Sequence, residues 1–105
     1  MSDTNYFASI VKILEKPVER IINDKIVTTE FRAQLAQVRN TRIVNLVFWG
    51  NLSLDVVNYY HINDYIMIEG YLLLDNKFSD KLNQQKLKRV SITVNKLYFL
   101  KPKRR

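Results

Sequence analysis

The chain has 105 residues, 47% of them hydrophobic and 11% aromatic, which suffices for one domain with a core and is unlike a disordered chain. No apolar run reaches the roughly 18–20 residues that span a bilayer, and the polar N-terminus resembles neither a secretory signal nor a transit peptide. The absence of cysteine excludes disulfides, thiolate catalysis and cysteine-ligated metal. We therefore expect a protein that works where it is translated, with no membrane partner.

The net charge of +7 is concentrated in the last third of the chain. Residues 43–76 contain four acidic residues and no lysine or arginine, whereas residues 77–105 contain ten basic residues and one acidic residue. A basic patch of this kind attracts a polyanion, and nucleic acid is the commonest one. A membrane surface or an acidic protein is a less favoured partner, and the simplest alternative is that the charges only keep the protein soluble.

The first half of the chain has the pattern of half-buried strands. Between Val27 and Leu35, mostly apolar side chains at odd positions alternate with polar side chains at even positions. The run Ile43 to Trp49 is β-branched and aromatic, and Gly50 allows a sharp turn at its end. We predict three strands in this half, at about Phe7–Leu14, Val27–Leu35 and Ile43–Trp49. Short polar turns are predicted at Asn23-Asp24-Lys25 and Arg39-Asn40-Thr41.

A single short helix is predicted after the third strand. Leu52, Val56 and Tyr60 recur at four-residue spacing, as on one helix face. Ser53 is the expected N-cap, and Asp55 is expected in the first turn, where the helix dipole favours an acid. At about two turns this helix needs a sheet to pack on.

The second half of the chain predicts two more strands separated by a long polar stretch. They are placed at Tyr65–Leu74 and Leu87–Leu100, with the polar stretch at Asp75–Lys86 between them. Both faces of the first of these strands are rather apolar, as in a closed barrel or at an oligomer interface. The order of elements fits an all-β, five-stranded Greek-key barrel with one short helix, the OB-fold. We expect one such domain over residues 1–100 and a basic tail over residues 101–105.

Several segments resemble the single-stranded DNA-binding (SSB) proteins of bacteria and plastids. Ile43 to Leu52 is similar to the family's third strand, which ends in an aromatic residue, a glycine and a polar residue before the helix. Val56 to Tyr60 is similar to its short helix, and Asp64 to Leu72 to its next strand, with the family's Glu-Gly step as Glu69-Gly70. Leu97 to Leu100 matches the end of its last strand. The likeness is strongest to the SSB-like proteins encoded in algal plastid genomes, and it covers the DNA-binding domain alone.

The resemblance implies binding by base stacking on aromatic side chains. Trp49 falls on the position of the family's stacking aromatic, with Phe48 expected on the opposite face of the strand. Ile43 stands where the family often has a tryptophan, Phe78 is placed as the loop aromatic, and Tyr71 is expected as either a stacking platform or an interface residue. The end of the second strand, at Ala36 to Val38, also offers no aromatic residue. Because each base stack contributes about 1–3 kcal/mol, the loss of these two aromatics predicts weaker, more salt-sensitive binding.

Basic residues around the long polar stretch and the second turn are expected to follow phosphates without reading bases. They are Lys77, Lys81, Lys86, Lys88 and Arg89, with Arg39 and Arg42 at the second turn. The alternative is that these are ordinary solvated loop charges. His61, a lone histidine, is expected at the surface or as a capping residue and not in a metal site. Phe31 is expected in the core, and Tyr59, Tyr60 and Tyr98 as packing residues with an exposed hydroxyl.

Two functional hypotheses follow, neither of them enzymatic. One histidine, no cysteine and two glycines leave no phosphate-cradling loop, no nucleophile motif and no cofactor or metal site in the pattern. The first hypothesis is sequence-independent binding of single-stranded DNA, or of RNA, in replication, repair or maintenance. The second is a protein-interaction or RNA-binding barrel that has lost most stacking residues.

The resemblance further implies a homo-oligomer, dimer or tetramer, in a plastid if organelle-encoded and otherwise in a bacterial cytoplasm. It implies no small-molecule substrate. The chain ends in basic residues where the family has an acidic tail, so docking of partners through such a tail is not implied.

Overall fold

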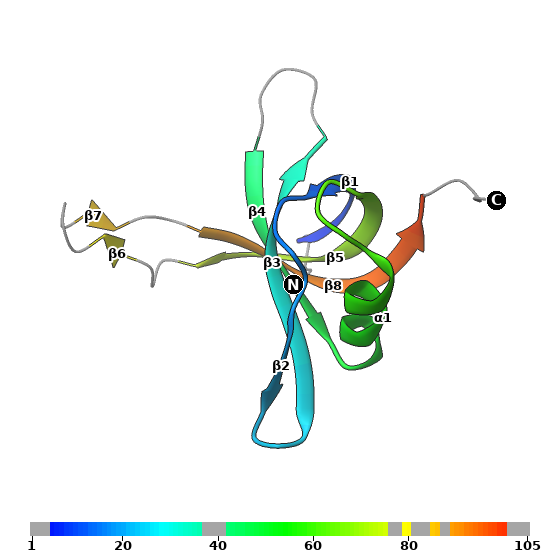
Figure 1. Ribbon diagram of the computed structural model, residues 1–105. Helices are drawn as coiled ribbons and strands as arrows, with labels where there is room; N and C mark the ends of the chain where they lie inside the picture. The colour runs from blue at the N-terminus through cyan, green and yellow to red at the C-terminus, as the bar shows by residue number, and fades with distance from the viewer. Residues whose placement is uncertain (1–4, 37–41, 76–78, 81–84, 87–88, 101–105) are drawn as a thin grey trace.

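The computed structural model describes residues 5–36, 42–75, 79–80, 85–86 and 89–100. In these ranges the chain forms strands and one helix (Figure 1). The elements are β1 (Tyr6–Ile13), β2 (Glu19–Ile22), β3 (Ile26–Leu35), β4 (Arg42–Trp49), α1 (Asn51–Tyr59), β5 (Tyr65–Asp75), β6 (Ser79–Asp80), β7 (Gln85–Lys86) and β8 (Arg89–Phe99).

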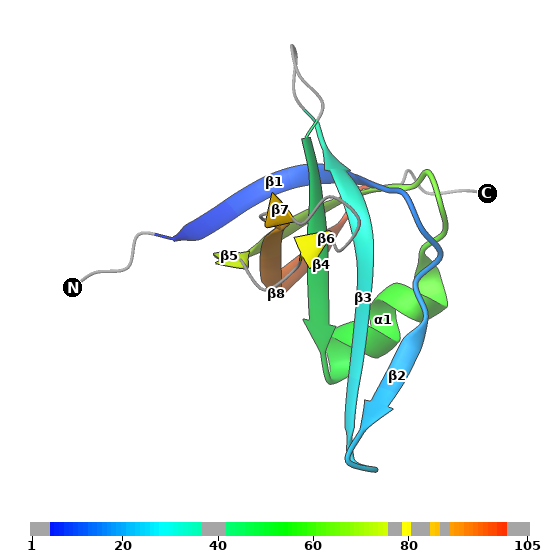
Figure 2. The same ribbon diagram turned by 90° about the vertical axis from the view of Figure 1, so that its left-hand side faces the viewer.

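Five long strands close into a barrel. Their order is β1-β5-β8-β4-β3, and β1 pairs with β3 at Val11↔Leu35 to close the ring (Figure 2). β4 and β8 run parallel, and the other neighbouring pairs in the ring are antiparallel. The predicted barrel with one helix between its third and fourth strands is therefore confirmed. β2, which was not predicted as a strand of its own, adds a sixth strand as a hairpin arm on β3.

The core of the barrel is formed by the side chains that point inward, at every second position of each strand. Phe31 on β3 and Phe48 on β4 stack with ring centroids 5.3 Å apart and lie at the centre of this core. Around them lie fully buried branched aliphatic side chains from the other strands, among them Val11, Ile13, Leu46, Ile66, Ile68 and Ile92. The alternation of β3 thus places Phe31 in the core, as predicted.

Two local features shape the strands that carry the outer face. Asn23 and Asp24 adopt left-handed φ values of 54° and 61°, a region that these residue types tolerate, and Lys25 N–H donates to Ile22 C=O at 3.1 Å. The hairpin turn predicted there is confirmed. Between β5 and β8 the register shifts after Glu69, with Asn95 of β8 as the extra residue, and a Cβ on Gly70 would lie 2.1 Å from the backbone oxygen of Thr93. Gly70 is therefore required for the close approach of β8.

The start of α1 differs from the prediction. The N-cap is Gly50, with φ at 63°, and no side chain caps the helix. Ser53 is instead a buried residue of the first turn, whose hydroxyl shares a hydrogen bond with the Thr29 hydroxyl of β3. The first turn holds no acid, because the helix begins at Asn51 and Asp55 follows one turn later. The predicted packing face is correct, since Val56 and the C-cap residue Tyr60 are buried. The Tyr60 hydroxyl is buried as well, so the prediction that it is exposed is wrong.

The long polar stretch contains a small ladder of its own. β6 and β7 pair antiparallel, Ser79 with Lys86 and Asp80 with Gln85, in a two-stranded sheet separate from the barrel. Figure 1 shows this pair well away from the barrel, on the opposite side from α1. This stretch therefore has strand structure within what was predicted as a long loop.

Candidate nucleic-acid interface

Trp49 is the exposed aromatic residue at the end of β4. Its side chain is 44% exposed, whereas the ring of the preceding residue, Phe48, is completely buried against Phe31. Adjacent residues of a strand point to opposite faces, so the core position of Phe48 directs Trp49 to the outside. The predicted arrangement of these two residues is confirmed.

The outer faces of β4, β8 and β5 join in one row that leads from Trp49 to Tyr71. Val47, two residues before Trp49 on the same face, pairs with Thr93 of β8, and Thr93 pairs with Tyr71 of β5. Since neighbouring strands lie about 4.8 Å apart, Tyr71 is roughly 10 Å from Val47 across the sheet. Tyr71 is 50% exposed and meets the ring of Tyr6 edge-to-face at 5.1 Å. The fold thus places two predicted aromatic sites on a single outer surface.

A basic residue on the hairpin arm extends this surface, and sequence reasoning missed it. Arg20 of β2 pairs with Thr28 of β3, and Thr28 pairs with Trp49. Arg20 is exposed and shares the outer side of the sheet with Trp49. The hairpin turn at Asn23 and Asp24 is enough to predict the pairing of Arg20 with Thr28 from the sequence. The pairing of Thr28 with Trp49 cannot be predicted in this way, because it depends on the register between β3 and β4.

Polar side chains occupy the part of the outer face between β3 and β8. Asn45 of β4 donates from Nδ2 to Glu30 Oε1 at 3.3 Å and to the Ser91 hydroxyl at 3.5 Å. Ile43, on the same side of β4, is 54% exposed. It therefore presents an aliphatic side chain where the resemblance places a stacking tryptophan.

A second cluster of aromatic residues lies further along β5, around Glu69. Tyr6 O–H donates to Glu69 Oε1 at 2.6 Å, and Tyr98 O–H donates to Glu69 Oε2 at 2.9 Å. The hydrogen bond from Tyr6, followed by that from Tyr98, lowers the pKa of Glu69, and the same bonds raise the pKa of each tyrosine. Further along the outer faces of β1 and β5 from this carboxylate lie exposed Ile10, which pairs with Met67, and exposed Tyr65, which pairs with Lys12.

The structure places only part of the predicted basic set. Arg42 is the first residue of β4 and is exposed at the rim of the barrel. Lys86 lies in β7 and Arg89 opens β8, but their side chains are outside the described parts of the chain. The remaining predicted contacts, Arg39, Lys77, Phe78, Lys81 and Lys88, also lie outside the described residues.

Other predicted roles are resolved by burial and hydrogen bonding. Tyr59 is 56% exposed, so its prediction as a packing residue is wrong; it precedes the C-cap of α1 and lies off the buried face. Tyr98 is partly exposed, with its hydroxyl on Glu69. His61 is exposed at the turn after α1, where its N–H donates to Asp64 Oδ2 at 2.8 Å.

Within the described ranges, no group of three or more histidine, aspartate or glutamate residues could hold a metal ion. The helix that the structure describes is too short and too polar to cross a membrane.

Solved structures with the same architecture are SSB domains. The SSB domain of a Synechococcus sp. protein superposes with a TM-score of 0.73 at 18% identity, covering 94% of this chain and 99% of that one. The small SSB of Streptomyces coelicolor gives a TM-score of 0.76 at 13% identity, covering 90% and 94%. The second SSB of Mycobacterium smegmatis gives 0.67 at 20% identity, covering 89% and 85%. The chain therefore has the OB-fold of SSB domains.

Sequence comparison identifies the family. No family model matches the chain. However, it is 38% identical over 98 residues to the "Putative single-stranded DNA-binding protein ycf41" of Trieres chinensis, covering 90% of this chain and 87% of that protein. The chain belongs to the family of ycf41-type single-stranded DNA-binding proteins.

Proposed function

We propose that this protein binds single-stranded DNA largely independently of sequence and catalyses no reaction. The observation that carries the proposal is the exposure of Trp49 on the same outer face as Tyr71, in a chain of the ycf41 type. Bases of any sequence have a π-face, so exposed aromatic rings on a strand bind them in a sequence-tolerant way. Arg20 beside Trp49 and Arg42 at the barrel rim supply positive charge for the phosphates.

The role of Tyr71 as a second stacking platform is part of this proposal. A Tyr71→Ala variant removes the ring and is expected to weaken binding of oligo-dT, whereas Tyr71→Phe keeps the ring and is expected to bind as wild type. Loss of binding in both variants would instead indicate that Tyr71 contributes to DNA binding through its hydroxyl and not by stacking of its ring.

Fluorescence anisotropy with end-labelled nucleic acids of one length tests the function. We expect oligo-dT to bind most tightly at low salt, duplex DNA of the same length to bind weakly, and a mixed-sequence single strand to bind almost as well as oligo-dT. A parallel titration with oligo-rU separates a DNA-binding from an RNA-binding function, because backbone charge and stacking serve both. Failure to bind any single strand would favour the alternative of a protein-interaction barrel.

We further propose that the protein self-associates through the outer faces of β1 and β5 around Glu69. Exposed Tyr65 and Ile10 and partly exposed Met67 form apolar surface there, beside the tyrosine-bound carboxylate. Contiguous apolar surface of this kind marks interaction sites. Sedimentation velocity is expected to show a dimer or tetramer for the wild type, and a smaller species for Ile10→Glu. An unchanged sedimentation coefficient in Ile10→Glu would contradict this assignment of the interface.

The similarity to the Trieres chinensis protein supports a plastid location for this chain, if it is organelle-encoded. Immunogold labelling of plastid nucleoids in the source cells would test this location.

A further inference from the structure

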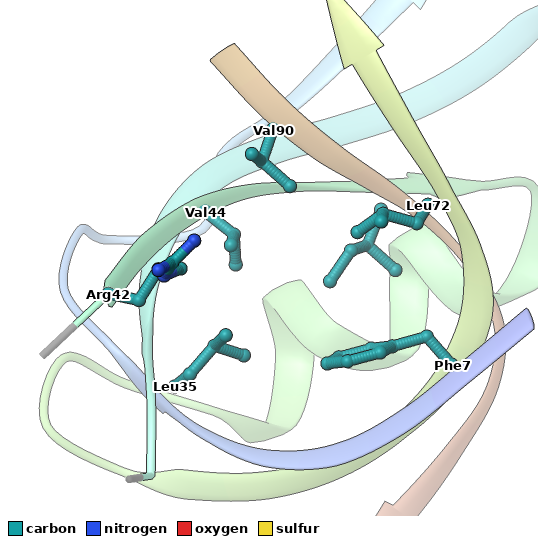
Figure 3. A pocket seen from close by; sticks show the side chains of 7 residues that line it. Phe7, Leu35, Arg42, Val44, Leu72 and Val90 are labelled. Carbon is teal, nitrogen blue, oxygen red and sulfur yellow. The ribbon is translucent and has the colours of Figure 1, made fainter. Parts of the chain in front are cut away.

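A cavity opens at the end of the barrel where β3 ends and β4 begins (Figure 3). Its volume is about 290 Å³. Six apolar side chains line it: Phe7, Leu35, Val44, Leu72, Val90 and Ile92. Among the residues that the structure describes, Arg42 completes the lining and is its one polar side chain. Helix α1 follows the far end of β4 and therefore leaves this mouth uncovered.

The size and chemistry of the cavity suit the ring of one pyrimidine base. An apolar cavity on the order of 150 Å³ is enough to bind benzene, so the larger volume here accommodates a substituted six-membered ring. The apolar walls match the ring face and the C5–C6 edge of a pyrimidine, whose polar edge must remain at the mouth, where its groups stay hydrated. Arg42 lies at that mouth, and its guanidinium can donate hydrogen bonds to a base carbonyl oxygen or to a phosphate.

The charge of the adjoining sequence favours a polyanion at this end. At the end where the cavity opens, β4 begins at Arg42 and β8 begins at Arg89, which pairs with Asp75 at the end of β5. These strand ends carry two arginines and one aspartate, a net positive charge. A positive potential at the mouth draws in a phosphate backbone and concentrates its bases beside an apolar cavity.

We propose that the mouth of the barrel takes one base of the bound single strand by insertion, with a preference for thymine. The inference rests on the proposed function and adds a second mode of base binding to stacking on the outer face. Thymine is favoured because its 5-methyl group adds apolar surface on the edge that enters the cavity. Burying one carbon of this kind changes affinity by about fourfold.

A comparison of oligo-dT with oligo-dU tests the insertion, because the two differ only in the methyl group. We expect the wild type to bind oligo-dT about fourfold more tightly than oligo-dU. Val90→Phe places a larger side chain in the cavity lining without altering the outer face, and is expected to bring the ratio close to one while retaining most of the affinity. The same dT:dU ratio in wild type and Val90→Phe would overturn the proposal, because the preference would then come from stacking outside the cavity.

Methyl NMR of the wild-type protein provides a test that needs no variant. An inserted base is expected to shift the methyl signals of Val44, Leu72 and Val90 by its ring current. Val47, on the outer face, is the reference for stacking alone. A shift of Val47 without shifts of the cavity methyl groups would overturn the insertion and leave the proposed function standing.

Two further outcomes distinguish failure of the proposed function from failure of the base insertion alone. Absence of binding to both oligonucleotides would overturn the proposed function and the insertion together. Cavity methyl shifts caused by an acidic peptide that contains phenylalanine, and not by oligo-dT, would overturn the insertion in favour of a protein partner.

Discussion

Trp49 and Tyr71 lie on the same outer face of the barrel, on the two strands that flank β8. Both rings are about half exposed, and the pairing of Val47 with Thr93 and of Thr93 with Tyr71 fixes their relative positions. Neither ring is needed for the hydrophobic core, which is closed behind them by Phe48 and the inward residues of β5. Binding and folding can therefore be separated by substitution on this face.

Substitution of the two neighbouring aromatics of β4 is expected to have opposite effects. Trp49→Ala removes a base stack, which contributes about 1–3 kcal/mol, so affinity for oligo-dT should fall by about tenfold or more with little change in stability. Phe48→Ala opens a cavity beside Phe31 and should destabilise the fold by about 3–5 kcal/mol. Anisotropy titrations and urea unfolding measure the two effects. A large loss of stability in Trp49→Ala would contradict the separation.

Arg20 is expected to contribute through charge alone. Arg20→Ala should weaken binding of every single-stranded sequence to the same degree and reduce the magnitude of the slope of log K against log salt by about 0.7. The matched control is Lys25→Ala, in the exposed turn of the same hairpin, three residues before Thr28 in the chain. We expect its salt slope to stay at the wild-type value. An equal reduction of the salt slope in the two variants would indicate that Arg20 acts only through the overall electrostatic field of the protein and does not contact a phosphate.

Two carboxylates are expected to make stability fall in acid. Hydrogen bonds from Tyr6 and Tyr98 lower the pKa of Glu69, and the backbone N–H of Arg32, with its side chain, lowers the pKa of Glu15. A lowered pKa in the folded state contributes stability that is present above the unfolded-state value of about 4.5 and lost as the pH falls through the folded-state value. The free energy of unfolding should thus decline below about pH 4.5. Glu15→Gln with Glu69→Gln should flatten this decline, and an unchanged slope would contradict the assignment.

Tyr60 is expected to limit stability in alkali. Burial at the end of α1 raises its pKa to about 12, from an ordinary value of 10.0. The folded state holds this proton more tightly than the unfolded state, so the resulting stability is complete below pH 10 and is lost as the pH rises through about 12. Absorbance at the tyrosinate band should show a late-titrating group that is missing in Tyr60→Phe. Retention of the late phase in Tyr60→Phe, with amplitude lost from the main phase, would show that Tyr60 ionises with the exposed tyrosines.

The sequence alone predicted the barrel because strand alternation is a local property. The odd and even positions of β3, the turn at Asn23-Asp24 and the opposite orientations of Phe48 and Trp49 follow from residues close in the chain. The same reasoning placed Phe31 in the core.

Features that depend on long-range contacts were not predicted. Ser53 has the residue type of an N-cap, but the buried hydroxyl of Thr29 is its partner, 24 residues away in the chain. Arg20 joins the site only through two successive strand registers, and the cavity exists only because β3 and β5 end where β4 and β8 begin. Local patterns contain none of this information.

The central claim is that a base stacks on Trp49, and the intrinsic fluorescence of this single tryptophan measures it directly. Titration with oligo-dT at low salt should quench the emission strongly. Physiological salt should lower the affinity and so move the midpoint of the titration to a higher oligo-dT concentration, without reducing the quenching at saturation. Binding of oligo-dT by anisotropy with no change in Trp49 emission at saturation would contradict the claim.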